Sequence, residues 1–231
     1  MNYFIFNGKN SKDKGIIITE MPQISKPAKR VDKITVPGRN GVIYQEDNSY
    51  ESIVIQIKCA LIEENININQ IKKWLDGEGR LILSTSPYVF YNANIINKID
   101  YKSIANIIHE FPLELELQPF SYTIEEYTEE IINTTEHSFI IQEATAEMYP
   151  YIKVEVETPG QINLTINNET MVLNVEDYIE LDCELMVAHR NYESKDDAVL
   201  GNFYKLYPGE NIISVLGNYK KIGIKYRKAY L

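Results

Sequence analysis

The chain has 231 residues, enough for one large or two ordinary domains, and its 44% hydrophobic and 24% charged residues are typical of a folded protein. The 33 acidic residues outnumber the 23 basic ones, and the resulting net charge of −10 excludes a general affinity for nucleic acid or anionic lipid. The first residues lack a basic segment followed by an apolar one, and no stretch approaches about 18 apolar residues. We therefore expect no signal peptide, no membrane span and synthesis in a reducing cytoplasm.

A basic segment follows two short predicted strands near the N-terminus, at residues 3–5 and 16–19. Its cationic side chains are Lys26, Lys29, Arg30 and Lys33. The simplest interpretation is a solvated loop. The functional alternative is an arm that pairs with the acidic surface of a neighbouring subunit.

Two turn dipeptides come next, and the first half of the chain is organised around them. We predict that Pro37, Gly38, Arg39, Asn40 and Gly41 form the connection of a hairpin, because Pro presets φ for a turn while Gly and Asn tolerate positive φ. Arg39 is then an exposed cation on a tight loop. Two roles remain open for it: stabilising the turn, or contacting another subunit.

The strand and helix signals that follow are clearer. Apolar residues alternate over 53–61 and again over 109–120, which predicts two strands with one buried face each. A helix is predicted over 67–76, with Asn67 as its cap, Trp74 in its apolar stripe and Gly77 at its end. Shorter strands are predicted near 80–83 and 88–95.

The second half shows short alternating strands separated by turn dipeptides such as Pro159-Gly160 and Gly217-Asn218. This spacing is typical of an antiparallel sandwich. Because residues 124–137 are rich in Glu and Thr with little periodicity, we place the domain boundary near residue 132. The predicted architecture is a mainly β domain over 1–132, a β-sandwich with one short α-helix, then an antiparallel β-sandwich over 133–231.

No catalytic or metal-binding constellation is found in the sequence. There is no glycine-rich phosphate loop and no Gly-x-Ser-x-Gly elbow, and the three histidines, His109, His137 and His189, are each interpreted as isolated. Glu114 and Glu116 lie two apart on one strand, so they face the same side and cannot flank a glycosidic bond. We therefore expect no enzyme activity, no cofactor and no metal.

Cys59 and Cys183 both lie at alternating apolar positions of predicted strands. We interpret them as buried free thiols, with a disulfide between them as the alternative. Two cysteines and three histidines give no zinc-binding spacing.

A set of short motifs occurs in one order between Phe4 and Phe120. They are Phe4-Ile5-Phe6-Asn7-Gly8-Lys9, Gly15-Ile16-Ile17-Ile18, Val36-Pro37-Gly38-Arg39-Asn40-Gly41, Trp74-Leu75-Asp76-Gly77, Gly79-Arg80-Leu81, Pro87-Tyr88-Val89-Phe90-Tyr91-Asn92-Ala93 and Gln118-Pro119-Phe120. In this order they resemble the distal tail protein family of siphophages. The second half resembles that family's C-terminal galectin-like sandwich in layout, with Tyr149-Pro150-Tyr151-Ile152 at its start and Pro208-Gly209-Glu210-Asn211 late in it.

The resemblance implies a structural role in the virion tail. Family members form a hexameric ring through their N-terminal domains, and the ring joins the tail tube to the baseplate or tip while DNA passes through its lumen. The implied partners are other copies of the chain, the tail tube protein, the tail-associated tip protein and receptor-binding or adaptor proteins. The acidic charge fits a lumen that repels DNA.

Three other functions are considered. The main alternative is a carbohydrate-binding module that contacts the host cell wall, with Tyr192, Tyr204 and Tyr207 as candidate stacking residues. A tail-tube or tail-terminator subunit is closer to the family but usually lacks the second domain. A cell-wall hydrolase is the third alternative.

Overall fold

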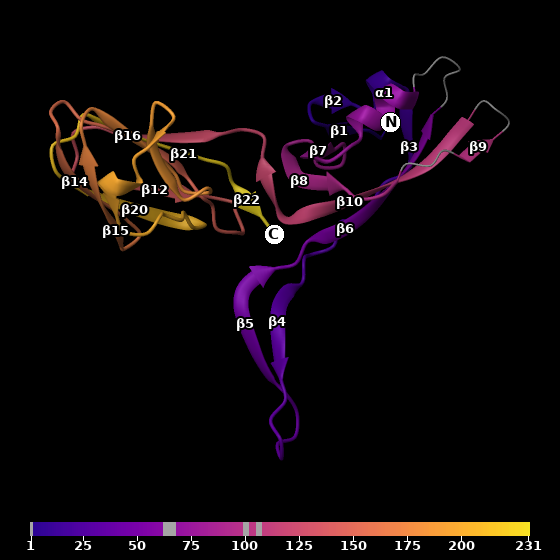
Figure 1. The fold of residues 1–231 in the computed structure, drawn as a ribbon, viewed down its shortest axis with the longest axis horizontal. Helices are drawn as coiled ribbons and strands as arrows, with labels where there is room; N and C mark the ends of the chain where they lie inside the picture. The colour runs from indigo at the N-terminus through magenta and orange to yellow at the C-terminus, as the bar shows by residue number, and fades with distance from the viewer. Residues whose placement is uncertain (1, 62–67, 99–101, 105–107) are drawn as a thin grey trace. The chain divides into compact units, whose positions relative to one another are not determined.

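The computed structural model describes residues 2–61, 68–98, 102–104 and 108–231. The chain divides into two compact units, one formed by residues 1–121 with Leu231 and the other by residues 122–230 (Figure 1). The boundary precedes the one predicted near residue 132, because residues 127–131 form a strand that pairs with strand β21 of the second unit.

The first unit is built on one large sheet in which the strands follow the order β2-β1-β7-β8-β10-β6-β3, with β9 also paired to β10. The bounds are β1 Phe4–Phe6, β2 Lys9–Asn10, β3 Ile16–Glu20, β6 Ile53–Leu61, β7 Glu78–Leu83, β8 Val89–Ile95, β9 Lys102–Ile104 and β10 Ile108–Thr123. The first unit also contains a 3-10 helix, η1 (Lys12–Lys14), and an α-helix, α1 (Ile68–Trp74).

Strands β6 and β10 pair antiparallel over nine residues, from Ile53 opposite Leu117 to Leu61 opposite His109. Their apolar residues alternate as predicted, and the inward side chains of Ile57 and Leu113 are fully buried. This ladder, which joins the two longest regular strands of the unit, is the centre of its hydrophobic core.

Helix α1 buries Ile71 and Trp74 against this core. The Trp74 indole donates a hydrogen bond from Nε1 to the Phe6 carbonyl oxygen (2.9 Å) and stacks on the Phe4 ring at 5.8 Å between centroids. Trp74 is therefore a core residue, as expected. Gly77 has the predicted left-handed backbone (φ +69°), whereas the predicted cap Asn67 lies outside the described residues.

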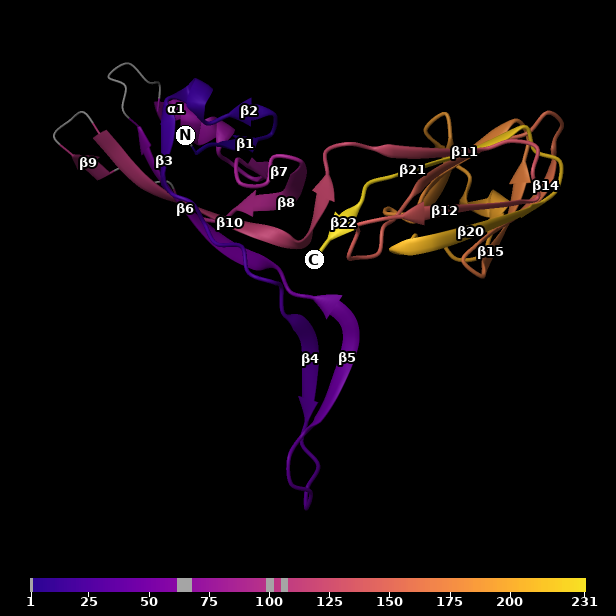
Figure 2. The same cartoon turned by 180° about the vertical axis from the view of Figure 1, so that it is seen from behind.

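Strands β4 (Lys29–Ile34) and β5 (Ile43–Tyr50) form a two-stranded sheet of their own, which Figures 1 and 2 draw as a separate hairpin. The interpretation of the basic segment as a solvated loop is wrong from Lys29 onward, because Lys29, Arg30 and Lys33 lie on β4. We call residues 29–50 the hairpin.

The second unit is a sandwich of two antiparallel sheets, ordered β11-β21-β13-β16-β17-β18 and β12-β20-β14-β15-β19. The bounds are β11 Tyr127–Ile131, β12 Glu136–Ile141, β13 Tyr151–Glu155, β14 Gly160–Ile166, β15 Glu169–Val175, β16 Tyr178–Asp182, β17 Val187–Arg190, β18 Glu193–Ser194, β19 Val199–Leu200, β20 Gly209–Leu216 and β21 Lys221–Tyr226. Strand β22 (Ala229–Tyr230) follows β21 and belongs to neither of these two sheets. A 3-10 helix, η2 (Asp196–Ala198), precedes β19.

Alternating residues of these strands fill the space between the two sheets. Ile152 and Ile224 on one sheet and Ile162 and Leu173 on the other are fully buried. The predicted fold class, a mainly β unit with a short α-helix followed by an antiparallel β-sandwich, is confirmed.

Candidate functional site

The connection of the hairpin contains the turn that the sequence predicts. The Arg39 amide donates to the Val36 carbonyl oxygen (3.1 Å) across Pro37 and Gly38, and Gly38 has φ +80°. A type II turn requires a residue of positive φ at its third position, and proline is common at its second position. Gly41 is also left-handed, at φ +83°, so both turn dipeptides bend the connection between β4 and β5.

The side chain of Arg39 is exposed and makes no hydrogen bond or ion pair with any residue that the structure describes. Only its backbone amide contributes to the turn. The guanidinium is therefore available to a partner.

The end of the hairpin, residues 34–44, is rich in exposed apolar side chains, and we call it the hairpin tip. Its large apolar residues are Ile34, Val36, Val42, Ile43 and Tyr44, with exposed fractions between 37% and 61%. Ile34 lies opposite Ile43 in the strand register, so the apolar groups come from both strands and from the connection. Contiguous exposed apolar surface of this kind is typical of an interaction site.

The base of the hairpin is fixed to the first unit, unlike its tip. The Tyr50 and Phe120 rings form a T-shaped contact with 5.6 Å between centroids, and the Glu51 amide donates to the Ala28 carbonyl oxygen (2.8 Å). Lys29 and Glu46 form an ion pair across the two strands (2.9 Å). The Tyr50–Phe120 contact joins the base of the hairpin to β10, whereas the tip remains exposed.

Charge also distinguishes the hairpin from the rest of the chain. Residues 29–50 contain four basic residues (Lys29, Arg30, Lys33, Arg39) and three acidic ones (Asp32, Glu46, Asp47), a net charge of +1 in a chain of −10. The hairpin therefore carries a small positive charge, in contrast to the acidic chain as a whole.

An acidic surface lies on the outward side of the β6–β10 ladder, which we call the ladder face. It carries Glu110, Glu114 and Glu116, and Gln56 donates to the Glu114 carboxylate (2.9 Å). Glu114 and Glu116 lie opposite Gln56 and Val54 and share one side of the sheet, as predicted. Lys58 on the same strand is paired with Glu20. The ladder face therefore presents a surplus of negative charge.

The three candidate tyrosines do not form one binding surface. Tyr204 is 0% exposed, and its hydroxyl donates to the Leu164 carbonyl oxygen (2.6 Å) inside the sandwich, where burial raises its pKa. Its proposed role as a saccharide contact is wrong, because an aromatic residue at an alternating apolar site belongs to the core. Tyr192 is fully exposed and Tyr207 partly exposed, so both remain candidates.

The interpretation of all histidines as isolated is wrong for His189. Its Nε2 lies 3.3 Å from the Tyr151 hydroxyl, and its Nδ1 lies 3.5 Å from Glu180, which is directly opposite on β16. His137 lies 3.8 Å from Glu129. Burial and the Glu180 charge raise the pKa of Tyr151 to about 12, so its phenol stays protonated at neutral pH and is a poor nucleophile. The side chain of His109 lies outside the described part of the chain.

Both cysteines are free and buried, as predicted, and burial raises the pKa of each thiol to about 12. Such thiols are unreactive near neutral pH. Within the described residues, no group of three or more His, Cys, Asp or Glu side chains could hold a metal ion, and no helix is long and apolar enough to cross a membrane.

Comparison with known proteins identifies the first unit. Residues 8–117 match the model of the phage tail protein RIFT-related domain. The first unit is a phage tail domain. The search of curated proteins gave no match.

One solved structure that is similar over the whole chain is the crystal structure of SPP1 Dit (gp 19.1), described as a paradigm of the hub adsorption apparatus in phages that infect Gram-positive bacteria. The two chains cover 100% of each other with a TM-score of 0.81 and 13% sequence identity. At this identity the likeness is one of fold. The resemblance to siphophage distal tail proteins is confirmed, and for the second unit the agreement is one of fold, since the fold match extends through the sandwich.

Proposed function

We propose that this protein is a structural subunit of the distal end of a phage tail, where six copies close into a ring. The ring joins the tail tube to the tip, its partners are the tail tube protein and the tail-associated tip protein, and receptor-binding or adaptor proteins attach outside it. The observation that carries the proposal is the match of residues 8–117 to a phage tail domain, together with a fold match over the full length to a phage hub protein. A tail-tube subunit is less well supported, because the fold match includes the second unit.

The hairpin supplies the contact that would close the ring. A two-stranded hairpin is at best marginally stable in water without packing against other structure, yet the tip buries almost nothing. Its apolar residues and its unpaired Arg39 are suited to a surface that is apolar at the centre and acidic at the rim. Another copy of this acidic chain offers such a rim, and rotational symmetry satisfies every hairpin at once.

Substitutions in the tip test this contact. Tyr44→Asp places a charge where we expect burial, and it should convert a six-subunit particle into monomers in light scattering. Arg39→Ala should weaken assembly without affecting the melting temperature, since its side chain has no partner within the described chain. The control is Tyr88→Asp, which changes a tyrosine of the first unit that is exposed and lies outside the hairpin. If Tyr44→Asp and Arg39→Ala assemble like the unchanged protein, the hairpin does not close the ring.

The ladder face is the candidate wall of the lumen through which DNA passes. Acidic residues on that wall would repel the phosphate backbone and prevent the DNA from adhering. Reversing three charges, with Glu110→Lys, Glu114→Lys and Glu116→Lys, should make the assembled protein retard duplex DNA in a gel and should slow DNA ejection from phage particles that carry it. Normal ejection with no DNA binding would place these carboxylates away from the lumen.

A further inference from the structure

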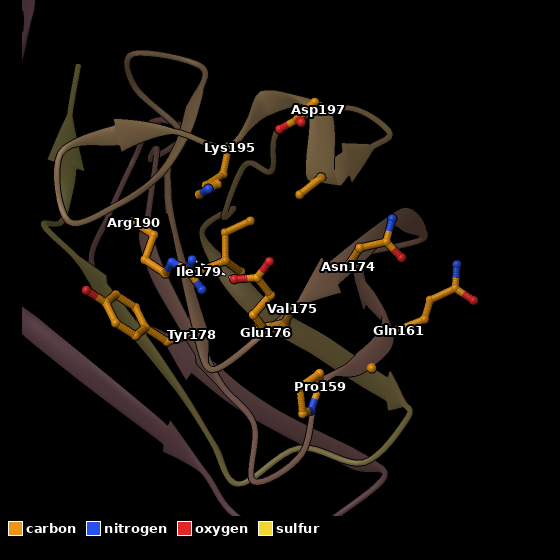
Figure 3. A pocket seen from close by; sticks show the side chains of 12 residues that line it. Pro159, Gln161, Asn174, Val175, Glu176, Tyr178, Ile179, Arg190, Lys195 and Asp197 are labelled. Carbon is orange, nitrogen blue, oxygen red and sulfur yellow. Dashed lines mark ion pairs between the residues drawn. The ribbon is translucent and has the colours of Figure 1, made fainter.

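One hollow of the second unit, of about 570 Å³, is lined by residues of strands β14 to β17 and of the segment 195–198 (Figure 3). Arg190 lines this pocket, and its Nη2 lies 2.6 Å from Glu176 while its Nη1 lies 2.7 Å from Asp177. The guanidinium is therefore already occupied by carboxylates of its own chain. The hairpin tip differs from the pocket, because the side chains of Arg39 and Asn40 have no hydrogen bond or ion pair with any described residue.

The dipeptide Asn40-Gly41 of the hairpin tip places two groups that can react with each other side by side in the chain. The backbone nitrogen that follows an asparagine can attack the side-chain amide carbon and close a five-membered ring. Glycine favours this attack, because it has no Cβ in the way and its backbone rotates freely. The two atoms must approach to about 3–3.5 Å in the right orientation. The reaction therefore depends on whether the asparagine is free to rotate.

Asn40 has this freedom. It is exposed, and within the described chain neither its side chain nor the Gly41 amide takes part in a hydrogen bond. Gly41 has φ +83°, and a Cβ built on it would meet no atom within 4 Å. Neither reacting group is engaged elsewhere, and the space around Gly41 is open.

The sequence contains a second Asn-Gly dipeptide, Asn7-Gly8, between β1 and β2, and there the asparagine is held in place. Asn7 Nδ2 donates to the Glu78 carbonyl oxygen (3.2 Å), and the Arg80 amide donates to Asn7 Oδ1 (3.0 Å). The same side chain lies over Gly79, in the space that a Cβ would need. Rotation of the Asn7 amide toward Gly8 would break both of these hydrogen bonds.

We propose that Asn40 is a site of spontaneous deamidation in the folded protein and that the contacts of Asn7 protect it from the same reaction. The Gly41 nitrogen forms a bond to Asn40 Cγ and loses its proton, and ammonia leaves, which gives a succinimide. Water then opens this ring at either carbonyl and leaves an aspartate or an isoaspartate. The net change is the hydrolysis of one amide to a carboxylate and ammonium, so no oxidant or cofactor is needed.

The product changes the charge of the hairpin next to Arg39. Residues 29–50 then contain four basic and four acidic residues, so their net charge falls from +1 to 0. An isoaspartate also inserts one methylene into the main chain of the connection between β4 and β5. Deamidation should therefore weaken the contact proposed to close the ring. This consequence rests on the proposed function, whereas the deamidation itself does not.

Peptide mapping of the full-length protein tests the deamidation. The folded protein is incubated in mildly alkaline buffer and digested with an acid-active protease, which prevents further reaction during digestion. Mass spectrometry then detects a carboxyl in place of each amide. We expect modification of Asn40 to proceed about tenfold faster than that of Asn7, because two side-chain hydrogen bonds of Asn7 must first break.

The matched control is the same incubation in concentrated urea, where neither dipeptide is constrained by the fold and the two rates should become similar. In the variant Asn40→Gln the peptide from the tip should remain unmodified, because the attack would have to close a six-membered ring. Equal rates at Asn40 and Asn7 in the folded protein overturn the proposal. A difference that persists in urea also overturns it, since that difference would come from neighbouring residues and not from the fold.

The variant Asn40→Asp reproduces one product and tests the consequence for assembly separately. In light scattering it should need about two- to fivefold more protein than the unchanged chain to form the six-subunit particle, the effect of one exposed charge. Equal assembly of the two proteins would overturn this consequence. A lack of assembly by the unchanged protein would count against the ring and not against the deamidation.

Discussion

The hairpin and the β6–β10 ladder are both antiparallel strand pairs, and they follow each other directly in the chain, but they differ in what they bury. Every second residue of β6 is buried, whereas no residue of β4 or β5 is. The ladder is stabilised by its own unit. The hairpin has paired backbones with no buried side chain on either strand, and this difference supports the proposal that its tip packs against another molecule.

The first way to test this difference is to truncate one side chain in each region. Leu113→Ala should lower the free energy of unfolding by roughly 2–5 kcal/mol, because it empties a fully buried position of the ladder. Tyr44→Ala in the hairpin tip should change it by at most about 0.5 kcal/mol, as expected for an exposed residue. Denaturant unfolding of the monomeric protein measures both, and comparable losses would show that the tip packs within its own chain.

A smaller effect concerns the thiol of Cys59. Burial in the ladder raises the pKa of this thiol from 9.0 to about 12. Between these two pH values the thiol is protonated in the folded state and ionised in the unfolded state. The free energy of unfolding is therefore at its full value below pH 9 and falls as the pH rises toward 12. At pH 10 the loss should be about 1.4 kcal/mol.

Unfolding curves at pH 8 and pH 10 measure this loss, with Cys59→Val as the control of similar volume. The variant should lose less stability over the same interval. An equal loss in both proteins would mean that the thiol is accessible to water in the folded state, and the ladder would be less tightly packed than its burial indicates.

The ladder was predictable and the hairpin only partly so, for one physical reason. Burial on one face imposes the alternation that Ile53 to Leu61 display, and that alternation can be read from the chain. The exposed strand β4 has no such constraint, and its run of Lys, Arg and Asp has the composition of a loop. Only its connection, where Pro37, Gly38 and Gly41 meet backbone requirements, was evident beforehand.

The candidate sites show the same limit. Tyr204 and Tyr192 are both tyrosines in the second half, but Tyr204 lies in the core and Tyr192 at an exposed turn, and this difference depends on the sheet pairing. The pocket around Arg190 combines residues from β14 to η2 that no spacing in the sequence connects. The contacts of His189 likewise arise from strands that only the fold brings together.

Negative-stain imaging of the purified protein, with its mass determined on the same sample, tests the central claim most directly. The account predicts a six-fold ring with a central hole and a mass of about 160 kDa, six times that of the 26.7 kDa chain. A protein that remains at 26.7 kDa, both alone and after mixing with the tail tube protein and the tail-associated tip protein, would contradict it.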